Sequence, residues 1–229
     1  MNLSGSDWIA VRLSLQVAAT AVMLSLPSAI LIGYILAKHR FKGKWILQNI
    51  IDLPLVLPPV VTGYFLLIVL GPKGPIGSIL ETTFHFKIAF NWFGAALASA
   101  VVSYPLMVRS IRSAFLSIDP RLELVSQSLG INPWRTFCLV SLPLSANGII
   151  AGCLLAFARS IGEFGATIMI AGDIPGQTRT IPLAIYSFSN TFGGIKSAWP
   201  LVVMAVLLSS LSLMCGELLE RRGWGNEHS

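Results

Sequence analysis

Charged side chains are scarce in this sequence. Asp, Glu, Lys and Arg make up 11% of its 229 residues, whereas hydrophobic residues make up 54%. Soluble domains carry about 25% charged residues. So little polar surface cannot solvate the chain in water, and a mean hydropathy of +0.74 predicts that lipid surrounds much of it. The net charge of +6 does not indicate nucleic-acid binding, because the basic residues fall in short runs between apolar segments.

Cysteine is also rare, and the usual catalytic motifs are missing. Cys138, Cys153 and Cys215 lie in apolar segments without a CxxC pair, so neither a disulfide framework nor a metal site is predicted. No GxxxxGK[ST] phosphate loop, HExxH or GxSxG motif occurs. We therefore expect a chain that is not an enzyme by itself, binds no cofactor and cannot cradle a nucleotide in a phosphate loop.

Ionisable residues are nearly absent from the apolar runs, apart from Asp52. Proton-coupled carriers tend to use carboxylates or histidines within their membrane spans. Their scarcity favours a passive pathway that another chain drives. A stand-alone secondary carrier or channel, and a membrane scaffold without transport activity, are the alternatives from other classes.

Five apolar runs are long enough to cross a bilayer as helices. The first lacks the basic leader of a secretory signal, and a cluster of bases follows it instead. The positive-inside rule then places the N-terminus outside and the C-terminus in the cytoplasm, with ten of the 16 Lys and Arg residues inside. The sequence predicts a single all-α integral membrane domain over 1–229. Its expected spans are 13–37, 45–70, 88–108, 138–157 and 197–216.

The segments between the spans are expected to be loops. Residues 71–87 and 172–196 are external, and residues 113–137 form the long inner loop. A sixth crossing within 160–192 is not expected, because Asp173, Pro175 and Arg179 interrupt it. Small residues recur within two spans and permit close helix packing. They are Ala95, Ser99 and Ser103 in the third span, and Gly148 and Gly152 in the fourth.

Three groups of residues are candidates for the pathway or its gate. Pro58, Pro59 and Thr62 lie where prolines remove backbone donors, so the stretch is either a bent helix start or a lining of the pathway. Arg159 and Glu163 are one turn apart, which predicts either an ion pair or a gate. A third group is expected to face an outer vestibule and contact a dianion, unless its arginine pairs with Asp173 or contacts a partner protein. It consists of Thr178, Arg179 and Thr180.

The inner loop carries a predicted docking element. Its apolar residues Leu122, Leu124, Val125 and Leu129 share one face of a short helix. Asp119-Pro120 can begin this helix, Gly130 can end it, and Asn132-Pro133 can begin a second one. The element either docks into a partner or rests on lipid headgroups.

This loop resembles the inner-loop signature of type I ABC-importer permeases. That signature reads EAA, three residues, Gly, nine residues, Ile-x-Leu-Pro. Gly130 and Val140-x-Leu142-Pro143 match its second half, whereas Leu124-Val125-Ser126 replace EAA and Glu123 stands one position early. The resemblance implies that the loop inserts into a cleft of a partner ATPase. The implied coupling residues are Leu122, Glu123, Leu124, Val125, Ser126, Leu129, Gly130, Leu142 and Pro143.

Three further stretches are similar to oxyanion permeases. Residues 52–65 and 157–168 resemble molybdate and sulfate importers, and residues 174–187 are most similar to the molybdate members. The resemblance implies a molybdate permease in the bacterial inner membrane, with sulfate, thiosulfate or tungstate as alternative substrates. It also implies a homodimer of permease chains, two cytoplasmic ATPase subunits that use the ATP, and a periplasmic molybdate-binding protein.

Overall fold

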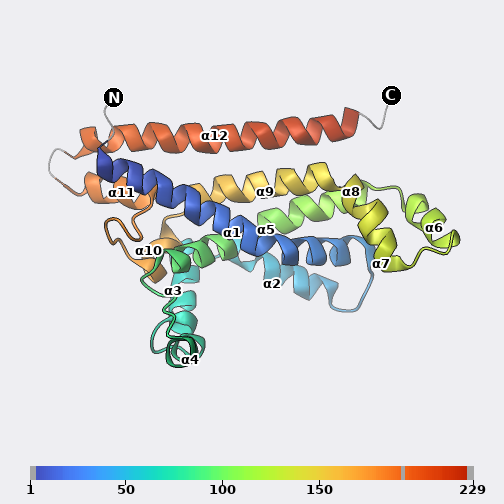
Figure 1. Ribbon diagram of the computed structural model, residues 1–229, viewed down its shortest axis with the longest axis horizontal. Coiled ribbons are helices and arrows are strands. Elements are labelled where there is room, and N and C mark those ends of the chain that lie inside the picture. Colours follow the sequence, from blue (N-terminus) through green and yellow to red (C-terminus); the bar gives the residue numbers. More distant parts are fainter. Residues whose placement is uncertain (1–3, 192–193, 226–229) are drawn as a thin grey trace.

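The computed structural model describes residues 4–191 and 194–225, and this part of the chain is helical with no strand (Figure 1). The elements are α1 (Gly5–Lys38), α2 (Lys44–Val56), α3 (Pro59–Leu70), α4 (Pro75–Phe84), α5 (Trp92–Ser117), α6 (Pro120–Ser128), α7 (Pro133–Thr136), the π-helix η1 (Phe137–Ser141), α8 (Leu142–Leu144), α9 (Ala146–Ile161), α10 (Gly165–Ala171), α11 (Ile181–Ser189) and α12 (Ile195–Gly225).

Four long helices, α1, α5, α9 and α12, run along the long axis of the molecule (Figure 1). α5 packs against both α1 and α9, and α9 packs against α12. Helix α1 begins and α12 ends at opposite ends of this axis (Figure 1). One core cluster joins α1, α5 and α9 through buried side chains that include Ala29, Met107, Ile111, Phe115 and Ala156.

Helix α1 begins at Gly5, well before the apolar run expected at 13–37. A capping box explains the early start: the Ser4 hydroxyl accepts from the backbone N–H of Asp7, and the Asp7 carboxylate accepts from the N–H of Ser4 at 2.8 Å. Further along, Gly33 lets α1 approach α5 closely, because a Cβ there would lie 2.8 Å from Cγ2 of Ile111.

The expected span over 45–70 is two helices rather than one. The axes of α2 and α3 differ by 110° at the break between them. Pro58 and Pro59 have no N–H to donate, and Pro59 occupies the first turn of α3, where that loss is tolerated. The prolines therefore end one helix and begin another instead of bending a continuous one.

Helix α4 corrects the expectation of an external loop at 71–87. Pro75 stands in its first turn and residues 75–84 are helical. Helices α3 and α4 pack against each other and project away from the four-helix bundle (Figure 1).

Helix α5 continues to Ser117, past the inner end expected at 108. Arg109 and Arg112 therefore lie within the helix. The Arg109 guanidinium makes two hydrogen bonds to the Asp52 carboxylate of α2, at 2.9 and 2.8 Å, and Phe115 beyond it is fully buried. The pairing of Arg109 with Asp52 and the burial of Phe115 let the helix continue where the sequence becomes polar.

The fourth expected span, 138–157, is also divided. Residues 133–144 and 146–161 form two helical segments whose axes differ by 67°. Pro143 cannot donate to a carbonyl four residues earlier, and the wider π-helical turn η1 ends two residues before it, at Ser141. Helix α9 then runs from Ala146 to Ile161.

The region expected as an outer loop at 172–196 contains helix α11 at 181–189. The first N–H of this helix, on Ile181, donates to the Ser14 hydroxyl of α1 at 2.7 Å. Helix α12 contains the expected span 197–216 and extends beyond it on both sides.

Three helices of the described residues are long and apolar enough to cross a membrane: residues 5–38, 92–117 and 196–218. The number rises to five if each of the two bent pairs is one span. The expected positions of the apolar segments thus agree with the helices, but only three of the five are unbroken.

Candidate functional site

Helix α6 lies at one end of the bundle, in the inner loop, and its ends are built as the sequence predicts. The Asp119 carboxylate caps the helix by accepting from the N–H of Arg121 at 2.9 Å, and Pro120 takes the first turn. Gly130 has a φ of +84°, in the left-handed region that glycine adopts readily. Asn132 caps the next helix, α7, by accepting from the N–H of Arg135 at 2.8 Å. These local predictions are confirmed.

The apolar side chains of α6 are presented to the outside. Leu122, Leu124, Val125 and Leu129 are all exposed. Three exposed aliphatic side chains on this nine-residue helix, and that of its C-cap Leu129, form a surface that water solvates poorly. We call these four residues the α6 apolar face.

Glu123 connects α6 to the bundle instead of joining this face. Its carboxylate lies 3.2 Å from Nζ of Lys38, at the end of α1, and accepts a hydrogen bond of 2.7 Å from the Ser141 hydroxyl of η1. Both side chains of the ion pair are only 14% exposed. Lys38 Nζ also lies 3.4 Å from the carbonyl oxygen of Ile118, just before α6. One carboxylate therefore ties α6 to two other elements.

Helices α6 and α7 are also joined directly. Ser126 is buried, and its hydroxyl lies 3.0 Å from that of Thr136. The Phe137 ring packs edge-on against Tyr34 of α1, with 4.7 Å between ring centroids, and also stacks with Trp134 at 5.5 Å. Leu142 and Pro143 follow within α8, where the chain bends toward α9. The inner loop is thus a folded unit held by polar and aromatic contacts.

Pro58, Pro59 and Thr62 lie at the beginning of α3, beside α10. Gly165 of α10 lies against Pro59, and Gly63 of α3 lies against the backbone of Ala166. The Thr62 hydroxyl is buried and has no hydrogen-bond partner in the described part of the chain. A buried hydroxyl without a partner is unfavourable and uncommon in folded proteins.

Arg159 and Glu163 form an ion pair of 2.6 Å between Nη1 and Oε2. The Glu163 side chain is 1% exposed and the Arg159 side chain 30%. The other carboxylate oxygen, Oε1, accepts from the N–H of Ala166 at 2.8 Å. Glu163 therefore satisfies a backbone donor in the first turn of α10 and joins that helix to the end of α9.

Thr178 and Arg179 are engaged within their own loop, whereas the buried hydroxyl of Thr180 has no hydrogen-bond partner among the described residues. The Thr178 hydroxyl donates to the carbonyl of Gly172 and accepts from the N–H of Ile174, and both threonines are buried. The Arg179 guanidinium contacts both carboxylate oxygens of Asp173, at 2.6 and 3.0 Å. Of the alternatives left open by the sequence, the pairing with Asp173 is the one present in this structure.

The small residues of the third and fourth spans lie at helix contacts. Ser103 donates to the carbonyl of Ser99 at 2.7 Å, and Ser160 of α9 donates to Ser103 at 3.3 Å. Ala95 is fully buried in a second core cluster. A Cβ on Gly148 would overlap Ala114, and one on Gly152 would lie 3.1 Å from Cβ of Ser110. Ser103, Gly148 and Gly152 lie where α5 and α9 meet, whereas Ala95 lies in a cluster that includes α10.

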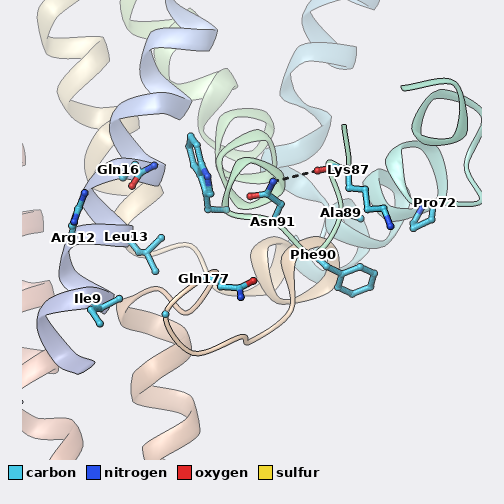
Figure 2. Close-up of a pocket in the computed structure, with 12 residues that line it drawn as sticks. Ile9, Arg12, Leu13, Gln16, Pro72, Lys87, Ala89, Phe90, Asn91 and Gln177 are labelled. Carbon is cyan, nitrogen blue, oxygen red and sulfur yellow. Dashed lines mark hydrogen bonds between the residues drawn. The ribbon is translucent and has the colours of Figure 1, made fainter. Parts of the chain in front are cut away.

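Sequence reasoning missed three ion pairs and a cavity, and one of the pairs is Lys87 with Glu81 at 3.0 Å. Lys38 with Glu123 and Asp52 with Arg109 join residues distant in the chain, and only the rarity of charge in apolar segments could have drawn attention to them. Among residues 4–191 and 194–225, no group of three or more His, Cys, Asp or Glu is placed to hold a metal ion. The cavity, shown in Figure 2, lies between α1, the start of α5 and the loop 172–177.

Residues 29–223 match the family described as "Binding-protein-dependent transport system inner membrane component". The chain belongs to this family. It is therefore a multi-pass component of the inner membrane and a transport subunit, and its apolar helices accord with that location.

Two relatives of this permease are molybdenum transport system permease proteins. The one from Escherichia coli strain K12 is 48% identical over 221 residues, which is 96% of each chain. The one from Haemophilus influenzae is 48% identical over 213 residues, 93% of each chain. A solved bacterial alginate ABC transporter, in complex with a periplasmic protein, shares the fold with a TM-score of 0.73 at 17% identity, covering 96% of this chain and 80% of that one.

Proposed function

We propose that the chain is the membrane-spanning permease subunit of an ATP-driven importer that carries molybdate across the inner membrane by alternating access. The observation that carries the substrate is the 48% identity to a molybdenum transport permease over 96% of both chains. Sulfate, thiosulfate or tungstate is the runner-up within the same class. A stand-alone carrier or channel is the alternative of a different class.

The proposed complex contains two permease chains, two ATPase subunits and a periplasmic molybdate-binding protein. The permease crosses the membrane five times, with its N-terminus outside and its C-terminus in the cytoplasm. The permease chain binds no cofactor, and the ATPase subunits use the ATP. The membership of a binding-protein-dependent family supports the presence of the periplasmic partner.

Coupling passes through the α6 apolar face. These four side chains are exposed on the inner loop, and burying them in a cleft of the ATPase removes apolar surface from water. Glu123, Ser126, Gly130, Leu142 and Pro143 act behind this face. Glu123 holds α6 against α1 and η1, and Ser126 holds it against α7, so that movement of the ATPase moves the helices of the bundle as rigid elements.

The gate is proposed around Glu163, Thr62 and the Pro58-Pro59 break, where α3, α9 and α10 meet. The ion pair of Arg159 with Glu163 and the glycine contacts of α3 with α10 connect these helices. Arg179 remains a candidate anion contact only if its pair with Asp173 opens. Thr178 and Thr180 are proposed to contribute less to the anion contact than Arg179, since both are buried.

Reconstitution tests this proposal. The permease is co-expressed with a candidate ATPase, incorporated into vesicles and supplied with a periplasmic binding protein and labelled molybdate or sulfate. ATP-dependent molybdate uptake that exceeds sulfate uptake is expected. Uptake that an ion gradient drives without ATP would establish the carrier instead, and preferential sulfate uptake would establish the runner-up.

The coupling contact is tested by cross-linking. Ser128 is exposed on α6, so Ser128→Cys is expected to cross-link to a cysteine in the ATPase cleft. Ser126 is a poorer position, because it is buried against Thr136. Absence of cross-links from Ser128→Cys in every nucleotide state would exclude the coupling role.

A further inference from the structure

A cavity of about 720 Å³ opens near the beginning of α1 (Figure 2). Figure 2 shows Arg12 and Gln16 of α1 on one side, Asn91 and Lys87 on the other, and Gln177 between them. Trp92 and the apolar residues Ile9, Leu13 and Phe90 complete much of the wall. No carboxylate is among the residues that line the cavity.

The charge around this cavity is positive and only partly neutralised. Asp7 is engaged in the capping box of α1, Glu81 pairs with Lys87 at 3.0 Å, and Asp173 pairs with Arg179. Arg12, in contrast, has neither an ion pair nor a hydrogen bond to any residue in 4–191 or 194–225. An uncompensated guanidinium on one wall of a cavity without carboxylates attracts an anion.

The N-terminus of α5 adds to this potential. Helix α5 has 26 residues and begins at Trp92, which lines the cavity, and its cap, Asn91, lines the cavity too. The positive end of a helix dipole favours a negative charge placed there. Phe90, just before it, has a φ of +58° and donates its N–H to the carbonyl of Ile170 at 2.9 Å. A bulky residue in the left-handed region is strained, and such strain persists only where surrounding contacts hold it.

We propose that this cavity binds a tetrahedral oxyanion, with Arg12 as the main charged contact and Lys87, which Glu81 partly neutralises, as a weaker second contact. The side-chain amides of Gln16, Asn91 and Gln177 supply neutral donors. The inference rests on the proposed function, in which the cavity receives the anion at the outer end of the permease. In this proposal the anion contacts Arg12, which has no partner among the described residues, instead of Arg179, which Asp173 neutralises.

The test is a calorimetric titration of molybdate into the permease–ATPase complex in nanodiscs, without a binding protein and in chloride buffer. Wild type is expected to bind saturably. Arg12→Gln is expected to weaken binding about tenfold, the usual order for losing a hydrogen bond to a charged group. Arg12→Lys should lose less, because it keeps the charge. Lys196→Gln removes an exposed cation outside the cavity and should bind like wild type.

Gln177→Ala provides a second variant on a loop, in case Arg12→Gln does not assemble. Equal affinity in wild type and in both cavity variants overturns the inference. Weaker docking of the periplasmic protein with unchanged molybdate affinity also overturns it, because the cavity would then be a protein contact.

The lipid arm separates free oxyanion from lipid phosphate. Affinity is expected to be equal in phosphatidylcholine and phosphatidylglycerol nanodiscs. Binding abolished by phosphatidylglycerol in wild type would assign the cavity to a lipid headgroup and overturn the inference. Absence of ATP-driven uptake by wild type contradicts the proposed function, whereas unchanged binding in the variants contradicts this inference alone.

Discussion

At the scale of single residues, ion pairs decide which charges remain available in this permease. Arg159 neutralises the buried Glu163, Arg179 neutralises Asp173 and Arg109 neutralises Asp52. The pairs differ in burial: the Glu163 side chain is 1% exposed and that of Asp173 23%. Removing one partner lowers the stability of the fold more where the remaining charge is more buried.

Arg159→Gln is therefore expected to lower the thermal unfolding midpoint more than Arg179→Gln. Breaking a fully buried pair costs about 3–5 kcal/mol, and the exposure of Arg159 places this change near the lower end of that range. Differential scanning fluorimetry of the purified protein in detergent measures both midpoints.

The double variant Arg159→Gln/Glu163→Gln is the control for this prediction. It removes the buried charge while an amide oxygen can still accept from the N–H of Ala166, so part of the loss should be recovered. Equal effects of Arg159→Gln and Arg179→Gln would contradict the argument from burial.

At the scale of elements, α6 is fixed by contacts on one side and free on the other. Glu123 of α6 contacts Lys38 and Ser141, and Ser126 of α6 contacts Thr136. The four side chains of the α6 apolar face are exposed. A helix built in this way can carry a displacement from a partner to α1 and η1 only while both sets of contacts are intact.

Lys38→Met is expected to reduce the molybdate transported per ATP hydrolysed. A coupling free energy of about 1 kcal/mol between the partly buried charges corresponds to a change of roughly fivefold. Uptake and ATPase activity are measured in the same vesicles.

Arg40→Gln is the matched control, because Arg40 is an exposed cation beyond the end of α1. Glu123→Gln in the Lys38→Met background removes the unpaired carboxylate and should restore part of the ratio. A normal ratio in Lys38→Met would show that the ion pair plays no part in coupling.

Leu124→Asn tests the α6 apolar face. It is expected to weaken co-purification of the ATPase at least about fivefold, because truncating an anchoring apolar contact costs more than about 1 kcal/mol. Gln127→Ala changes an exposed polar residue of the same helix and should retain the partner. If both variants retain the ATPase equally, the docking surface lies elsewhere.

At the scale of the whole molecule, α3 and α4 project from the bundle, and α10 anchors their base (Figure 1). The anchor depends on the absence of a side chain at Gly63, because a Cβ there would lie 2.6 Å from the carbonyl oxygen of Ala166. The approach of these two helices sets the direction of the α3–α4 arm.

Gly63→Ala is expected to destabilise the fold by roughly 1–3 kcal/mol, as other overpacking substitutions do. Gly162→Ala is the control, since its nearest neighbour would be 4.0 Å away and its φ of −87° suits alanine. Thermal unfolding measures both. A similar midpoint for the two variants would mean that α3 is free to move away from α10.

Features that depend only on near neighbours in the chain follow from the sequence. The caps at Asp119 and Asn132, the turn at Gly130 and the positions of the apolar segments follow from side-chain hydrogen bonding, glycine conformation and hydropathy over short windows. The α6 helix was predicted for this reason. The family resemblance rested on the same local stretches.

The tertiary structure alone decided which helices break and which charges meet. Pro58, Pro59 and Pro143 predicted irregular backbone. The angles of 110° and 67° between the helix axes on either side of the two breaks depend on what each segment packs against. Residues as distant as Asp52 and Arg109 pair because folding brings α2 beside α5. Local propensity contains no information about such contacts, so the unpaired state of Arg12 and the shared role of Glu123 emerge only when the helices are assembled.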